Sequence, residues 1–274
     1  MRVCYVTTDS LSEGVGTSQI VPLVCGIKGA GHEVTVISME KFSNPELAGE
    51  LKSKGINWIK LEFGRRGVVS GLLRLIRLVI KIPKADVYHA RSDIPALALI
   101  IRRKRPILWD IRSLWMEQRA VISGDKVHFK LLNKLWILVE KLISSRSSAI
   151  NTLAYELQPA LRKRLGQIPS LRTVVPTSVS LQKFKFSEEL PKEKSVMLSG
   201  TFNNFYDKNL TEFVMCTFAE SGYQAKWCRP KESLENILNV KDLEVLEAKH
   251  EEMPPQIASS SIGILSAGMM LEFL

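Results

Sequence analysis

The sequence predicts an α/β protein with two Rossmann-like domains, each built on a parallel sheet. One observation is the order at the start of the chain: a β-rich run at 3–7, a polar segment with glycines, an apolar helix-like segment at 19–26 and a second β-rich run at 33–37. This order is a βαβ unit, which implies parallel strands joined by a right-handed crossover. The other observation is that a strand, a glycine and a helix start recur in the same order from residue 195.

Strands and helices are expected to alternate through a first domain of residues 1–186. Pro22 fits only the first turn of its helix, and Pro176 ends the last strand, because proline has no backbone N–H to donate. The β-rich runs predict strands at 3–7, 33–37, 56–59, 86–89, 106–109, 148–152 and 173–176. The apolar patterns predict helices at 19–26, 45–54, 68–82, 94–101, 127–143 and 155–165.

A charged segment at 187–194 separates a second, smaller domain. It contains Pro191 and lacks apolar periodicity, which is typical of a linker. Residues 195–274 form the second expected domain. Its strands are expected at 195–200, 225–228 and 262–265 and its helices at 210–221 and 255–259.

The composition limits the classes of partner. The 274 residues are 45% hydrophobic and 24% charged, as in ordinary globular proteins, and carry a formal net charge of +10. This balance favours anionic partners: nucleic acid, phospholipid head groups or phosphorylated ligands. The basic residues are dispersed, and no zinc-finger, RRM or KH pattern is present, so no nucleic acid is expected.

The cysteine spacing and the hydropathy of the chain indicate whether it binds a metal and in which compartment it resides. The four cysteines form no C-x-x-C pair, so no metal site is expected. No signal-peptide pattern opens the chain, and no apolar run reaches the roughly 18 residues that a bilayer span needs. We expect a cytoplasmic protein.

A glycine-rich loop follows the first strand, with the sequence Gly14-Val15-Gly16-Thr17-Ser18-Gln19. Glycine lets the backbone approach a ligand closely, and the N–H groups at a helix start attract phosphate. The pattern predicts a ligand site at Gly14, Gly16 and Thr17. The full G-x-G-x-x-G pattern is not met, because Gln19 stands at its last position, and Glu40 is the candidate acidic partner. A flexible turn between strand and helix explains the pattern equally well.

Polar residues end two later strands. Asp110 and Arg112 are expected at the carboxyl edge of the sheet, where parallel sheets bind ligands. A carboxylate accepts hydrogen bonds from sugar hydroxyls and the planar guanidinium suits phosphate, so both are catalytic candidates. His89 is a ligand-binding candidate, and Asp93 is expected to cap the next helix. An ion pair that braces a loop and a structural histidine are the alternatives.

The second domain repeats the pattern in Ser199-Gly200-Thr201 and in Tyr206-Asp207-Lys208-Asn209-Leu210. Gly200 and Thr201 are ligand-binding candidates. Lys208, near a helix start, is a catalytic candidate that would neutralise a diphosphate. The alternative is an exposed lysine without a role.

The segment 68–82 predicts an amphipathic helix with Arg74, Arg77 and Lys81 on one side. Its basic and apolar composition suits a membrane interface, so an anionic membrane surface is among the expected partners. The protein could then be bound peripherally at the inner face of the plasma membrane as well as being cytoplasmic. A helix packed on the sheet with a solvated basic face is the alternative.

In this order, the pieces resemble family 4 of the retaining glycosyltransferases, which have the GT-B fold. The matching segments are MRVCYVTTDSLSEGVGTSQ, GHEVTVIS, WDIRSLWMEQR, VEKLISSRSSAINTLAYELQPAL, VVPTSVSLQKF and SGTFNNFYDKNL. The resemblance covers nearly the whole chain, and it rests on the order of the segments rather than on one motif.

The resemblance implies transfer of a sugar, with retention at the anomeric carbon, from a UDP- or GDP-sugar and without an obligatory metal or other cofactor. It implies a glycan or lipid-linked acceptor, as in polysaccharide biosynthesis, with the acceptor on the first domain and the donor nucleotide on the second. Carried over by position, Gly14 and Gly16 would lie near the donor phosphates or the acceptor. Asp110 and Arg112 would lie near the transferred sugar, and Lys208 at the diphosphate.

Two positions and one segment depart from the family pattern. Thr201 stands where the family has a basic residue, and Ser180 where aspartate is usual. The Glu-x7-Glu segment of the family is expected after residues 262–265, but only Glu272 follows. The second domain is therefore expected to be incomplete, which leaves an inactive fragment as one interpretation.

Two other functions fit the same sequence. One is a GT-B sugar-nucleotide epimerase, which needs a set of carboxylates and histidine for acid–base chemistry. The other is a non-catalytic remnant that binds phosphate or a membrane surface.

Overall fold

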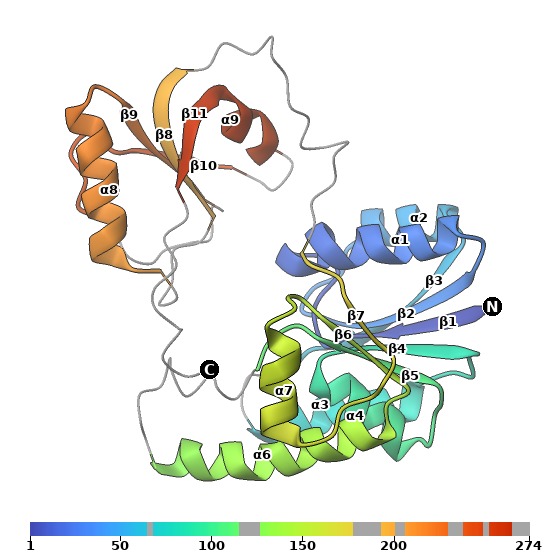
Figure 1. Ribbon diagram of the computed structural model, residues 1–274. Helices are drawn as coiled ribbons and strands as arrows, with labels where there is room; N and C mark the ends of the chain where they lie inside the picture. The colour runs from blue at the N-terminus through green and yellow to red at the C-terminus, as the bar shows by residue number, and fades with distance from the viewer. Residues whose placement is uncertain are drawn as a thin grey trace. The chain divides into compact units, whose positions relative to one another are not determined.

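The computed structural model describes residues 1–64, 68–114, 127–177, 193–200, 206–229, 238–248 and 252–264. The chain divides into two compact units, Met1–Ser178 and Val179–Leu274 (Figure 1). The predicted linker at 187–194 lies outside the described residues except for its last two, which already belong to a strand. The assignment of the acceptor to one domain and the donor to the other stays a prediction.

The first unit is built on a seven-stranded sheet in the order β3-β2-β1-β4-β5-β6-β7. All of its strand pairs are parallel. The order reverses between β1 and β4, which is the position where open α/β sheets bind ligands. The strands are β1 (Arg2–Val6), β2 (Glu33–Glu40), β3 (Ile56–Glu62), β4 (Val87–Arg91), β5 (Ile107–Ile111), β6 (Ala149–Thr152) and β7 (Arg172–Val174).

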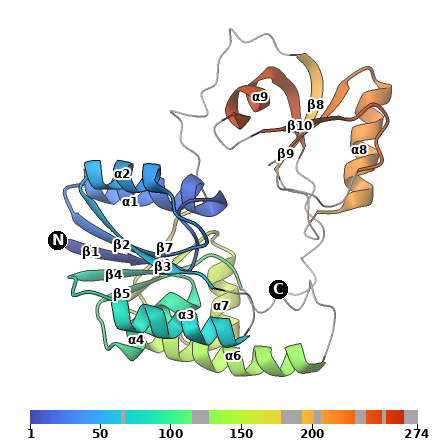
Figure 2. The same cartoon turned by 180° about the vertical axis from the view of Figure 1, so that it is seen from behind.

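Helices cover both faces of this sheet (Figures 1 and 2). One face carries the π-helical turn η1 (Gly16–Ile20), α1 (Val21–Gly29) and α2 (Pro45–Ser53). The other carries α3 (Val68–Lys81), α4 (Asp93–Ile101), α6 (Val127–Arg146) and α7 (Leu157–Leu165). Side chains alternate along a strand, so each face has its own core. Tyr5 and Leu51 belong to the first core, and Trp109, Leu99 and Ile143 belong to the second.

The second unit has a four-stranded parallel sheet in the order β10-β9-β8-β11. Its core centres on the buried side chains of Leu198, Met215 and Trp227. The elements are β8 (Glu193–Ser199), α8 (Lys208–Glu220), β9 (Gln224–Arg229), β10 (Glu244–Glu247), α9 (Met253–Ser259) and β11 (Ser260–Ile264).

The predicted α/β class with two parallel sheets is confirmed. Each predicted strand and helix is present within the described residues, with bounds that shift by a few residues. Pro22 lies in the first turn of α1, as expected. The strand β10 was not predicted, because its Glu-Val-Leu-Glu sequence lies at the edge of the sheet and is too short to show a strand pattern.

A buried polar network ties α4, α6 and α7 to the sheet. Asp93 accepts hydrogen bonds from the indole Nε1 of Trp109 at 3.3 Å and of Trp136 at 2.8 Å. One helical turn along α6, Glu140 pairs with Arg164 of α7 at 2.6 Å. The expectation that Asp93 caps its helix is wrong: Ser92 holds the capping position, and the carboxylate of Asp93 turns inward to the indoles. Burial raises the pKa of Asp93 to about 6.

This raised pKa predicts a pH-dependent stability that the substitution Asp93→Asn removes. An aspartate whose pKa is higher in the folded state is most favourable when protonated, so its contribution to stability falls as the pH rises from about 4 to above 6. The free energy of unfolding of the Asn variant relative to the native chain should therefore increase by up to about 3 kcal/mol between pH 4 and pH 7.5. Urea denaturation at the two pH values measures this difference.

Asp86→Asn is the matched control with the opposite sign. Asp86 is exposed and its pKa is lowered by hydrogen bonds from Arg2, so its removal should cost stability at neutral pH rather than at low pH. A relative stability of Asp93→Asn that stays flat from pH 4 to 7.5 would contradict the network.

Candidate functional site

Polar side chains gather at the carboxyl edge of the first sheet, around the switch point between β1 and β4. The strand register places Arg91 of β4 beside Asp110 of β5, and Asp110 beside Asn151 of β6. Strand alternation puts these side chains on the face opposite to Trp109 and its core. The row of three polar residues is therefore a consequence of register, and it lies where the fold favours ligand binding.

Asp110 is the centre of this group, which we call the Asp110 cluster: His89, Arg91, Asp110, Arg112 and Asn151. The carboxylate is 1% exposed. Its Oδ1 accepts from Asn151 Nδ2 at 2.7 Å and lies 3.5 Å from Arg112 Nη1. Its Oδ2 lies 3.2 Å from His89 Nε2 and 4.0 Å from Arg91 Nη1. A buried carboxylate is stable only with such compensation.

The pKa of the Asp110 carboxyl is lowered despite its burial. Burial by itself raises the pKa, but the hydrogen bond and charge of His89 and the charge of Arg112 outweigh that effect. Asp110 is therefore ionised at neutral pH. Both carboxylate oxygens of Asp110 already contact side chains of the cluster. Asp110 therefore holds Arg91 and Arg112 in place.

Gln19 joins this cluster to the helix that follows the glycine loop. Its Oε1 accepts from Nη2 of Arg91 and from Nη2 of Arg112, each at 3.0 Å. Arg91 also donates through Nε to Asp9 at 2.9 Å. Among the described residues, Nε of Arg112 is buried and has no hydrogen-bond partner. Within the described part of the chain this donor is therefore unused, and its burial closes it to solvent.

The glycine loop is shaped by a close backbone contact. A Cβ atom added at Gly16 would lie 1.8 Å from the carbonyl oxygen of Ser10 and 2.5 Å from Cα of Leu11. Gly14 has a φ of +49°, a left-handed conformation that favours glycine. The N–H of Gly16 donates to Glu13 and the hydroxyl of Thr17 to the carbonyl oxygen of Leu11. These two donors are used within the loop itself.

Glu40, the candidate acidic partner of the dinucleotide pattern, already accepts hydrogen bonds from residues of this chain. Its carboxylate accepts from the hydroxyls of Ser10 at 2.6 Å and Ser12 at 2.9 Å, and from the backbone N–H of Leu11 at 2.9 Å. Ser38 donates to the same carboxylate at 2.5 Å. Glu40 therefore anchors the start of the glycine loop to the end of β2.

His89 is packed rather than free. Its ring centroid lies 4.5 Å from that of Tyr5, and its Nε2 faces the ionised Asp110. Because a carboxylate only accepts, Nε2 carries the proton in this contact. The residue after Arg91, Ser92, has a φ of +73° without being glycine, a strained conformation of the kind that clusters at functional sites.

The second unit places Gly200 and Lys208 after β8. Gly200 has a φ of +102°, its N–H donates to Cys228, and its carbonyl oxygen accepts from the indole of Trp227 at 3.0 Å. Lys208 is the first residue of α8 and is half-exposed, with its Nζ 3.7 Å from Glu212. Thr201 lies outside the described residues, as do Ser180 and Glu272.

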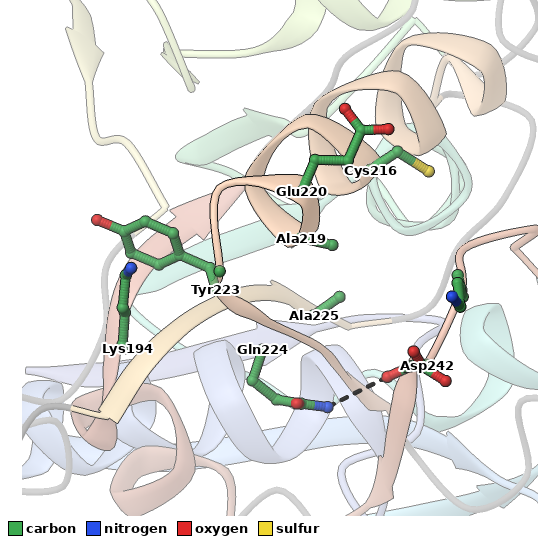
Figure 3. Close-up of a pocket in the computed structure, with 10 residues that line it drawn as sticks. Lys194, Cys216, Ala219, Glu220, Tyr223, Gln224, Ala225 and Asp242 are labelled. Carbon is green, nitrogen blue, oxygen red and sulfur yellow. Dashed lines mark hydrogen bonds between the residues drawn. The ribbon is translucent and has the colours of Figure 1, made fainter.

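A pocket of about 560 Å³ opens at the amino ends of the strands of the second sheet (Figure 3). It lies between the end of α8 and the start of β9, where Gln224 donates to the carbonyl oxygen of Asp242 at 3.1 Å. Lys194 lies over the ring of Tyr223, 4.9 Å from its centroid. None of the predicted site residues lines this pocket, so it is separate from the carboxyl edge.

Sequence reasoning found part of the Asp110 cluster and missed the rest. It named His89, Asp110 and Arg112, which the structure brings together. It missed Gln19 and Asn151 as partners, although a polar residue inside an apolar strand run was a usable signal for Asn151. Within the described part of the chain, no three His, Cys, Asp or Glu side chains are placed to hold a metal ion. No described helix is both long and apolar enough to cross a bilayer.

Comparison with solved structures identifies the fold. The chain is similar to a glycosyltransferase from Rickettsia africae (12% identity, TM-score 0.59, covering 97% of this chain and 73% of that one). It is similar to a protein assigned as a UDP-N-acetylglucosamine 2-epimerase from Listeria monocytogenes (11% identity, TM-score 0.59, 96% and 73%). It is also similar to the glycotransferase of kitacinnamycin (12% identity, TM-score 0.56, 98% and 76%).

No family model matches the sequence, and no curated protein matches it. At these identities the likeness shows the fold alone. The chain has two Rossmann-like units on parallel sheets, the GT-B arrangement of elements that these structures share.

The Asp110 cluster predicts a large cost for Asp110→Asn. The substitution keeps the shape but leaves Arg91, Arg112 and His89 without their shared anion, which should lower the free energy of unfolding by roughly 3–5 kcal/mol at pH 7. Since the pKa of Asp110 is lowered, its contribution is present above about pH 4 and is lost as the pH falls through the folded-state value. Urea denaturation at pH 7 and pH 3 measures both effects.

Asp9→Asn is the control, because Asp9 also pairs with Arg91 but is half-exposed. Its cost should stay below about 1 kcal/mol. Equal losses for the two variants would contradict the central place of Asp110.

The close contact in the glycine loop predicts that Gly16→Ala destabilises the first unit. The added methyl group overlaps backbone atoms that cannot move away without opening the loop, so a loss of at least about 1–3 kcal/mol is expected. Gly26→Ala is the control, because nothing lies within 4 Å of its Cβ position inside α1. That variant should gain about 0.5–1 kcal/mol from helix propensity. Thermal unfolding compares the two, and a tolerated Gly16→Ala would show the loop contact to be wrong.

Proposed function

We propose that the protein is a glycosyltransferase that moves a sugar from a nucleotide-diphosphate sugar to a glycan or lipid-linked acceptor. The observation that carries this proposal is the Asp110 cluster. It holds two guanidinium groups and an imidazole at the switch point of the first sheet. The GT-B fold supports it, since solved glycosyltransferases have the same arrangement of elements.

The chemistry calls for cations in fixed positions. When the bond between the anomeric carbon and the diphosphate breaks, negative charge grows on the departing phosphate and positive charge on the sugar ring. Cations already oriented toward that phosphate lower the barrier, because no reorganisation is needed as the charge develops. Arg112 meets this requirement best among the described cations of the cluster, because Gln19 and Asp110 hold its guanidinium while its side chain is 15% exposed, against 6% for Arg91.

Lys208 is the corresponding candidate in the second unit. It stands at the start of α8, where the helix dipole also favours an anion. Its contact with Glu212 is long at 3.7 Å, and an exposed ion pair of this kind is weak, so the ammonium group is available to a diphosphate. Gly200, in a backbone conformation that favours glycine, ends the strand just before this point.

Retention at the anomeric carbon, a UDP- or GDP-linked donor and a lipid-linked or polysaccharide acceptor belong to the same proposal. A retaining front-face path needs no side chain as a base, because the departing phosphate takes the proton of the acceptor hydroxyl as the new bond to the anomeric carbon forms. A peripheral site at the membrane fits the basic character of the chain and of α3.

A sugar-nucleotide epimerase is the second candidate, and the pair of His89 and Asp110 favours it. Such a pair could move a proton at a carbon next to the anomeric centre, and one of the similar structures is assigned as an epimerase of this kind. The environment of the pair argues against this activity. Asp110 is ionised and both of its oxygens already have partners, and the Tyr5 ring packs against the His89 ring.

A direct assay separates the two activities. The 274-residue chain is incubated with UDP- and GDP-sugars and lipid-linked or oligosaccharide acceptors, and products are identified by mass spectrometry and proton NMR. Transfer predicts release of the nucleoside diphosphate and an α-linked product from an α-linked donor. A changed sugar still attached to the nucleotide would instead establish the epimerase, and an inverted product would remove retention.

Lys208→Ala should lower kcat/KM for transfer about a hundredfold, because it removes a cation that stabilises the leaving diphosphate. Lys241→Ala is the control: Lys241 belongs to the same unit but lines the pocket at the opposite edge of the sheet. Turnover in Lys241→Ala should be unchanged. Unchanged turnover in Lys208→Ala would take that residue out of the site.

A further inference from the structure

Two helices on one face of the first sheet expose apolar side chains to solvent. On α3 these are Val69 (74% exposed), Leu72, Leu73, Ile76 and Ile80 (65% exposed). On α6 they are Leu132, Leu135, Leu138 (62% exposed) and Leu142. Exposed apolar residues are ordinary when scattered, but a contiguous set on a monomer marks an interaction surface.

In each helix the exposed residues form one stripe. At about 3.6 residues per turn, residues spaced by three, four and seven fall on the same side of a helix. The α3 stripe lies opposite Leu78, and the α6 stripe lies opposite Glu140 and Ser144, all of which are buried. Both stripes therefore face away from the sheet. Because α4 packs against both α3 and α6, the stripes belong to one helical layer (Figures 1 and 2).

The charge on this layer has one sign. The acidic residues in α3, α4, α6 and α7 are Asp93 and Glu140, and both are buried. The helices α1 and α2 on the other face differ, since α2 exposes Glu46 and Glu50. The basic residues of the layer whose side chains the structure describes outside the buried Glu140–Arg164 pair are Arg74, Arg77, Lys81, Lys134, Lys141, Arg146, Arg162 and Lys163.

Each stripe has cations beside it rather than within it. On α3, Arg74 stacks over the ring of Phe63 and Arg77 donates to the end of β3, so these groups flank the stripe on the β3 side. On α6, Lys134 and Lys141 are exposed next to the leucines. An apolar strip bordered by Lys and Arg is the pattern of a helix that lies in the plane of a membrane interface.

We propose that the layer of α3 and α6 docks on an anionic lipid bilayer, with both apolar stripes at the level of the acyl chains and the basic side chains at the head groups. Charge decides between this occupant and a second copy of the chain. A symmetric dimer would place the same basic residues opposite one another, and the helices of the layer hold no exposed acid to pair with them, while Glu62 of β3 already pairs with Arg77. An anionic bilayer offers a negative partner to the exposed members of this set at once.

Vesicle co-sedimentation of the 274-residue chain tests the proposal. The chain should bind vesicles of phosphatidylcholine with 30 mol% phosphatidylglycerol and should not bind vesicles of phosphatidylcholine alone. Ile80→Glu and Leu138→Glu should each weaken binding about tenfold or more, because a carboxylate enters the apolar stripe and repels the anionic surface. Phe213→Glu, at a residue that is 68% exposed on α8, makes the same charge change elsewhere and should bind as the native chain does.

Absence of binding to the anionic vesicles, or equal binding by the two stripe variants and the Phe213→Glu control, would overturn the proposal. Analytical ultracentrifugation detects the competing occupant. If the native chain forms a dimer and does not bind vesicles, and if Ile80→Glu dissociates that dimer, the surface belongs to a second copy of the chain. The proposal deepens the proposed function by locating its membrane contact, but vesicle binding needs neither donor nor acceptor, so the two can fail separately.

Discussion

The first unit depends on one buried anion. The Asp110 side chain stands in the middle of a parallel sheet and is 1% exposed. The charges of Arg91 and Arg112 balance its own, and the imidazole of His89 and the amide of Asn151 lie within hydrogen-bond distance of it. Register alone sets Arg91 and Asn151 beside it. Gln19 extends the arrangement to the glycine loop. The cations of the carboxyl edge are therefore placed before any ligand arrives, which is the condition for electrostatic catalysis.

The strand β5 joins this edge to the helical layer on the opposite face. Asp110 points to the cluster, while its neighbour Trp109 points the other way and donates to Asp93 at the start of α4. Trp136 of α6 donates to the same carboxylate. Two adjacent residues of one strand thus serve two polar networks on opposite faces. The helices that carry the exposed apolar stripes are fixed to the strand that carries the proposed sugar-binding residues.

The sequence predicted the alternation of strands and helices well, because parallel strands are apolar runs and their ends are marked by glycine or polar residues. It also indicated that His89, Asp110 and Arg112 share an edge. It did not reveal Gln19 and Asn151 as partners, since strand order and register are needed to bring distant residues together. It offered Glu40 as a candidate acidic partner of an incomplete pattern, and it did not reveal the hydrogen bonds of Glu40 to Ser10 and Ser12, because these serines lie in a loop without a recognisable pattern. The role of Lys208 remains a prediction.

The central claim is that the edge around Asp110 receives the transferred sugar. A crystal structure of the chain with a non-hydrolysable nucleotide sugar tests it most directly. The account predicts density for the sugar or its phosphate within hydrogen-bond distance of Arg112, with the carboxylate of Asp110 still bound to its cations. A nucleotide sugar held only at the pocket beside Tyr223, or bound without contact to Arg112 or His89, would contradict it.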